Sequence, residues 1–247
     1  MNIVEFGCDH PDVIVLLHGG GLSWWQYEES AALLAERFHV VLPLLDGHAG
    51  SDAPFTTMAD CAQHVIDHID AAYGGRVTLL GGTSLGGQAA AEILSRRDDI
   101  CDFAVLESTL VIPMSVTAAC IRPAYALCYP LIKKRWFAQL QFLSMGLPPD
   151  QFEAYFRDSA CISKADMTAF LAANASFPLP AGLADCRAKT LILAGRCELP
   201  VMKRSARRLA AVIPNAQLDI LPGYAHGEAS IRHPQQFADS LLHLIGC

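Results

Sequence analysis

The chain has 247 residues, of which 52% are hydrophobic and 17% are charged, and its formal net charge is −7. This length allows one α/β domain with a full core and a small insertion, and this composition excludes an intrinsically disordered chain. The longest basic run is Lys133-Lys134-Arg135, which is too short for a nucleic-acid footprint. We therefore expect no nucleic-acid partner.

The N-terminal residues and the cysteines indicate the cellular compartment of the protein. Residues 1–6 contain an acid and no basic region, so we expect no secretory leader, and no apolar stretch is long enough to cross a membrane. The nine cysteines lack CxxC spacing and resemble small buried apolar side chains in a reducing compartment. We expect a cytoplasmic protein, a monomer or a homodimer, with no membrane partner.

Strands and helices alternate along the chain. In order, the patterns predict a strand at 13–17, a helix at 23–37 with Ser23 as its N-cap, a strand at 39–44, a helix at 58–73 ended by Gly74-Gly75, a strand at 76–80, a helix at 88–94, strands at 103–106, 190–194 and 218–221, and a closing helix at 233–244. The strand segments are continuously apolar, which favours a parallel sheet covered by helices on both faces.

One long segment interrupts this alternation. Residues 112–180 are helical in pattern, apolar and aromatic, and several prolines punctuate them. We therefore predict a core formed by residues 1–111 and 181–247, with a helical insertion at 112–180.

The segment Gly82-x-Ser84-x-Gly86 lies between a β-rich run and a helix-forming run. This is the context of a nucleophile elbow, a sharp turn that exposes a serine hydroxyl at the top of a sheet. The turn strains the serine backbone, and side chains at the neighbouring positions would clash, so glycines are needed there. We predict Ser84 as a nucleophile.

A serine hydroxyl needs a base, and the base needs an orienting group. His226 lies on the loop after the last strand, where it can reach across the strand ends. Glu198 follows the preceding strand and could accept the His226 Nδ1–H. Glu107, just after the strand at 103–106, is the alternative acid.

Backbone N–H groups are also needed for the developing oxyanion. The loop His18-Gly19-Gly20-Gly21 and the residue after the nucleophile, Leu85, could provide them. We predict Gly20 and Leu85 as the oxyanion hole, with Gly21 as the alternative to Gly20.

No cofactor is expected. The Gly-rich loops lack the P-loop Lys and the dinucleotide-binding glycine spacing. His64 and His68 lie one helical turn apart, but no third metal ligand is apparent, so we predict no metal site.

Together, the elbow, the Gly-rich loop and the order serine, acid, histidine resemble the α/β-hydrolase superfamily, in its capped, esterase-like branch. The resemblance implies a mostly parallel, doubly wound sheet of about seven strands, with the insertion at 112–180 as a helical cap. It implies that Ser84, Glu198 and His226 form a catalytic triad, with Glu198 in place of the family's usual Asp.

The resemblance implies a serine hydrolase that cleaves a carboxylic ester or thioester of a small, fairly apolar acyl compound through an acyl-enzyme. The alternatives are a carbon–carbon bond hydrolase or lyase with the same triad and, third, a non-catalytic ligand-binding relative, because fold cannot separate these. The expected substrate-binding residues are Gly19, Gly21, Trp24, Trp25 and Trp136.

Overall fold

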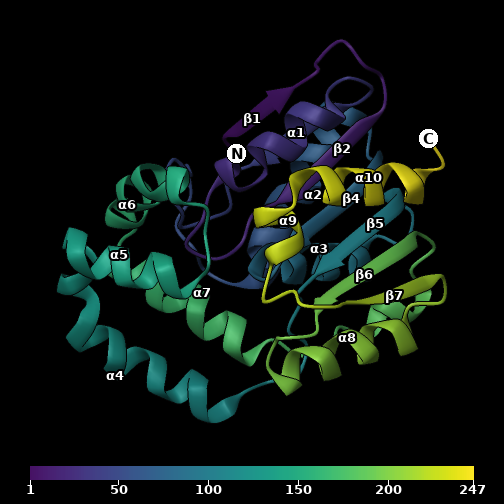
Figure 1. Ribbon diagram of the computed structural model, residues 1–247. Coiled ribbons are helices and arrows are strands. Elements are labelled where there is room, and N and C mark those ends of the chain that lie inside the picture. The colour runs from purple at the N-terminus through teal and green to yellow at the C-terminus, as the bar shows by residue number, and fades with distance from the viewer.

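The computed structural model describes residues 1–247 and contains one seven-stranded sheet in the order β1-β3-β2-β4-β5-β6-β7 (Figure 1). Strand β1 pairs antiparallel with β3, and every other pair is parallel. The strands are β1 (Ile3–Phe6), β2 (Val13–Leu17), β3 (His39–Pro43), β4 (Val77–Thr83), β5 (Cys101–Glu107), β6 (Lys189–Gly195) and β7 (Ala216–Leu221). The mostly parallel, doubly wound sheet predicted from the sequence is confirmed.

Helices cover both faces of this sheet. They are α1 (Glu28–Leu34), α2 (Met58–Tyr73), α3 (Leu85–Arg96), α4 (Ser115–Ile132), α5 (Arg135–Ser144), α6 (Phe152–Cys161), α7 (Lys164–Ser176), α8 (Pro200–Val212), α9 (Glu228–Arg232) and α10 (Pro234–Ile245). Helices α1 and α10 pack on one face, and α2, α3 and α8 pack on the other.

The central strands supply side chains to both layers. On β2, Ile14 and Leu16 belong to the apolar cluster under α1 and α10, whereas Val13, Val15 and Leu17 belong to the cluster under α2, α3 and α8. Successive side chains of a strand point to opposite faces, so a continuously apolar strand is what a sheet covered on both faces requires.

Several elements differ from the sequence-based prediction. The helix expected at 23–37 is a 3₁₀ turn at Trp24–Tyr27 followed by α1, which ends at Leu34, and the Ser23 side chain makes no cap hydrogen bond. Helix α8 was not predicted. The expectation that the cysteines are buried is wrong for Cys8, Cys120, Cys161, Cys197 and Cys247, which are exposed.

Helices α4 to α7 come between β5 and β6, and α4, α5 and α6 lie apart from the sheet (Figure 1). Helix α7 packs against the core through Met167 and Phe170. Helices α4 and α5 leave large apolar side chains exposed, among them Leu127 and Leu140. The boundaries of a separate cap at 112–180 stay a prediction.

None of the helices combines the length and the apolar character that crossing a bilayer requires.

Candidate active site

Ser84 lies in a strained turn between the end of β4 and the start of α3. Its φ of 56° is in the left-handed region, which residues other than glycine rarely adopt. A Cβ on Gly86 would lie 1.9 Å from the carbonyl oxygen of Leu17, and one on Gly82 would lie 2.4 Å from backbone atoms of Gly86. Only glycine fits at these two positions, so the sequence-based reason for the motif is confirmed.

Three side chains from distant segments meet at this turn. Nε2 of His226 lies 3.0 Å from Oγ of Ser84, and Nδ1 of His226 lies 3.0 Å from Oε2 of Glu198. The Glu198 side chain is fully buried, whereas 49% of the His226 side chain is exposed. The structure therefore aligns a hydroxyl, an imidazole and a buried carboxylate, all within hydrogen-bonding distance.

Ser108 positions the carboxylate and was not anticipated from the sequence. Its hydroxyl donates to Oε1 of Glu198 at 2.9 Å and accepts the backbone N–H of Gly227 at 2.9 Å. The second donor to Oε1 is the N–H of Gly195, at 2.6 Å. Ser108 also has a positive φ, 49°. It therefore links the end of β5 to the loops that carry both Glu198 and His226.

Glu107 has other partners than His226. Its carboxylate accepts the Thr83 hydroxyl at 2.7 Å and the N–H groups of Ala229 and Ser230 at 3.0 and 3.2 Å. Complete burial raises the pKa of this carboxyl, although its hydrogen bonds oppose the shift. Of the two candidate acids, the structure brings Glu198 to His226, and Glu107 braces the start of α9.

Of the three glycines in the Gly-rich loop, one has a free N–H. Gly19 donates its N–H to Oε1 of Gln26 at 2.8 Å, and Gly21 donates its N–H to Nε2 of His48 at 3.0 Å. The N–H of Gly20 has no acceptor within the protein. Leu85 occupies the first position of α3, where N–H groups have no intrahelical acceptor.

Two buried histidines hold this loop in place. His18 accepts the N–H of Leu45 through Nε2, and its Nδ1 lies 3.0 Å from the carbonyl of Gly19. Burial lowers the pKa of His18 to about 3 and the pKa of His48 to about 4. Both rings are therefore neutral near pH 7, which allows Nε2 of His48 to accept the Gly21 N–H.

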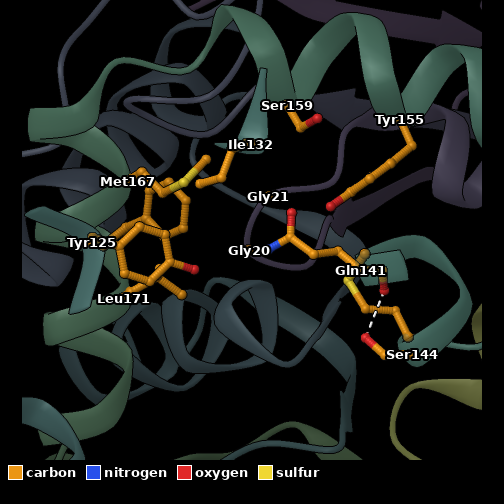
Figure 2. Close-up of a pocket in the computed structure, with 12 residues that line it drawn as sticks. Gly20, Gly21, Tyr125, Ile132, Gln141, Ser144, Tyr155, Ser159, Met167 and Leu171 are labelled. Carbon is orange, nitrogen blue, oxygen red and sulfur yellow. Dashed lines mark hydrogen bonds between the residues drawn. The ribbon is translucent and has the colours of Figure 1, made fainter. Parts of the chain in front are cut away.

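One cavity contains Ser84, and a neighbouring cavity shares Gly20, Ser144 and Met145 with it. The first has about 400 Å³ and is lined by Ser84, His226 and apolar side chains such as Leu22, Leu147 and Ile231. The second has about 180 Å³ and lies between the Gly-rich loop and helices α4 to α7 (Figure 2). Substrate could therefore reach Ser84 between the sheet and the inserted helices.

The glycines and the tryptophans of the predicted substrate site behave differently. Gly19 and Gly21 each line one of the two cavities. Trp24, Trp25 and Trp136 line neither. Trp25 is 3% exposed and donates Nε1–H to Asp158 of α6, and Trp136 is 58% exposed on the outside of α5. The structure thus does not bring the tryptophans to Ser84. The 3₁₀ turn directs the Trp25 side chain towards α6.

Comparisons with known proteins agree with the fold. The model of the alpha/beta hydrolase family matches residues 14–240. A polyketide synthase, ThaQ of Burkholderia thailandensis, is 27% identical over 243 residues, which cover 93% of the chain but only 11% of that relative's length.

Solved structures match at low sequence identity. An esterase from Exiguobacterium antarcticum superposes with a TM-score of 0.83 at 17% identity, covering 99% of this chain and 95% of that one. The enol-lactonase from Burkholderia xenovorans LB400 gives a TM-score of 0.82 at 17% identity, with the same two coverages. The family match spans nearly the whole chain, so this protein belongs to the alpha/beta hydrolase family.

Proposed function

We propose that the protein is a serine hydrolase that cleaves an ester or thioester of a small, fairly apolar acyl compound through an acyl-enzyme. The observation that carries this proposal is the alignment of Ser84, His226 and Glu198, with both contacts at 3.0 Å. This is the arrangement that activates a serine hydroxyl at neutral pH.

In the first half of the reaction, Ser84 Oγ attacks the substrate carbonyl carbon and His226 Nε2 takes the hydroxyl proton. The new bond joins Oγ to the carbonyl carbon, the bond to the leaving oxygen or sulfur breaks, and His226 returns the proton to that atom. In the second half, a water molecule attacks the acyl-enzyme with the same base, which releases the acid and restores Ser84.

The roles of the remaining groups follow from their positions. The Glu198 carboxylate holds the proton on Nδ1 of His226 and stabilises the imidazolium that forms. The N–H groups of Gly20 and Leu85 stabilise the oxyanion. Gly20 is preferred to Gly21 because His48 already occupies the Gly21 N–H.

The cavities support an uncharged substrate. No Asp, Glu, Lys or Arg side chain lines either cavity, and the one histidine in the two linings is the proposed base His226. A charged acyl group would lose its hydration without compensation. Because a polyketide synthase is among the relatives, we include thioesters as well as oxygen esters among the proposed substrates. We further propose that residues 112–180 act as the cap that closes the acyl site.

The test is hydrolysis of p-nitrophenyl esters with acyl chains of two to twelve carbons by wild type and Ser84→Ala. We expect turnover with an optimum chain length, lost in Ser84→Ala. The matched control is Ser144→Ala, which removes a cavity-lining serine whose hydroxyl contacts only the Gln141 carbonyl. Turnover that survives in Ser84→Ala would contradict the proposal.

A further inference from the structure

The second cavity contains a buried acceptor without a donor. Gln141 lies on the inward side of α5, and its Oε1 is inaccessible to solvent and has no hydrogen-bond partner. Figure 2 shows the Gln141 amide extending into the middle of the cavity, below the label of Gly21. Buried polar atoms in proteins are hydrogen-bonded with few exceptions, so this oxygen calls for a donor from outside the chain.

Neighbouring hydroxyl groups do not supply that donor. The Ser144 hydroxyl donates to the backbone carbonyl of Gln141 at 2.7 Å, and the Ser159 hydroxyl donates to the carbonyl of Phe156. The hydroxyl groups of Tyr125 and Tyr155 reach into the cavity (Figure 2) but make no hydrogen bond with Gln141. The cavity thus presents several polar groups to whatever occupies it.

The chemistry of the lining defines the group that would fit. The remaining lining is apolar, with Ile132, Met167, Phe170 and Leu171, and no lining residue carries a charge. Burial also raises the pKa of Tyr155 to about 12, so its hydroxyl is neutral near pH 7. A neutral donor on an otherwise apolar chain satisfies Gln141 Oε1 without placing an unpaired charge in the cavity.

The cavity is also connected to the reacting centre. It shares Gly20, Ser144 and Met145 with the cavity that contains Ser84. A Cβ on Gly20 would touch Leu85 on one side and Phe170 on the other, which places this loop at the junction. An acyl group bound at Ser84 can therefore extend past Gly20 towards Gln141.

We propose that the acyl chain of the substrate carries a hydroxyl group, and that this hydroxyl donates a hydrogen bond to Oε1 of Gln141. The inference rests on the proposed function for the position of the carbonyl at Ser84. It makes Gln141 the residue that selects hydroxylated acyl chains over plain ones.

The experiment measures binding without turnover. In a Ser84→Ala background, titration calorimetry gives the Kd of p-nitrophenyl octanoate and of its 3-hydroxy and 7-hydroxy derivatives. We expect at least one hydroxylated ester to bind about tenfold more tightly than the plain ester, as one net hydrogen bond allows. Adding Gln141→Leu should remove this preference, whereas Gln139→Leu, on the exposed side of the same helix, should retain it.

A stability measurement separates recognition from a structural role. Because Oε1 has no partner, replacing Gln141 with leucine should leave the midpoint of thermal unfolding unchanged or raise it. The proposal is overturned if no hydroxylated ester is preferred, or if Gln141→Leu weakens plain and hydroxylated esters equally. Failure of the serine hydrolase proposal appears separately, as no turnover by wild type, while the binding preference remains measurable.

Discussion

Replacing Glu198 with glutamine tests whether this side chain sets the tautomer of His226. The two carboxylate oxygens have different partners. Oε1 accepts from the Gly195 N–H and the Ser108 hydroxyl, and Oε2 faces Nδ1 of His226. Glutamine keeps an acceptor oxygen at only one of these positions. The Oε1 position faces two donors and the Oε2 position faces one. We therefore expect the amide oxygen of the glutamine to occupy the Oε1 position and its NH₂ group to face His226.

An NH₂ group facing Nδ1 favours the tautomer with the proton on Nε2. That proton then points at Ser84 Oγ, and His226 cannot accept the hydroxyl proton. In a serine protease, the corresponding change from Asp to Asn lowers kcat about ten-thousand-fold, which is about 5.5 kcal/mol of transition-state stabilisation. We expect a loss of similar size for Glu198→Gln, with little change in KM.

The assay is steady-state hydrolysis of the best p-nitrophenyl ester of the chain-length series. The matched control is Glu107→Gln, because Glu107 is buried at the same edge of the sheet but contacts Thr83 and Ala229. Its kcat, per folded protein, should stay within about tenfold of wild type, the effect of one hydrogen bond. A Glu198→Gln enzyme that keeps a tenth or more of the wild-type kcat would refute the tautomer argument, as would equal losses in both variants.

Three further predictions concern the residues around the triad. Ser108→Ala should lower the free energy of unfolding by about 1–3 kcal/mol in urea titrations, because it leaves the Gly227 N–H without its acceptor; an unchanged midpoint would contradict this. Gly86→Ala should yield no stably folded enzyme by circular dichroism, because its Cβ would overlap the Leu17 carbonyl; a folded, active variant would contradict the elbow geometry. The pKa values of His18 and His48, lowered to about 3 and about 4, mean that the unfolded chain binds more protons below pH 6.5, so stability is lost as pH falls. Between pH 7.5 and 5, each ring should lower the free energy of unfolding by about 2 kcal/mol. The His48→Gln side chain can still accept the Gly21 N–H, so the free energy of unfolding of this variant should fall by about 2 kcal/mol less than that of wild type. The raised pKa of Glu107 acts in the opposite direction, and it does so in both proteins.

The fold was predictable because its signals are local. Continuously apolar segments such as 13–17 and 103–106 predicted buried parallel strands, and Gly74 predicted the end of α2, where it adopts a φ of 66°. The helix expected at 23–37 is shorter than predicted and begins as a 3₁₀ turn, because tertiary contacts override propensity there. Tyr27 is fully buried with its hydroxyl against Thr83, which turns the chain into a 3₁₀ segment before α1.

The candidate site was predictable where residue type and turn geometry coincide. The elbow glycines and the loop positions of His226 and Glu198 follow from sequence, whereas the choice of Gly20 over Gly21 depends on His48, which lies 27 residues away. Ser108 was missed because a lone serine after a strand gives no signal, although it lies directly after the alternative acid Glu107. Gln141 was missed for another reason, since only the packing of α5 shows that its amide is buried.

Labelling with a fluorophosphonate probe tests the central claim, that Ser84 is the activated nucleophile, most directly. Intact mass spectrometry of the wild-type protein should show a single adduct, peptide mapping should place it on Ser84, and Ser84→Ala should show none. An adduct on another residue, or no adduct in wild type under conditions that label a known serine esterase, would contradict the account.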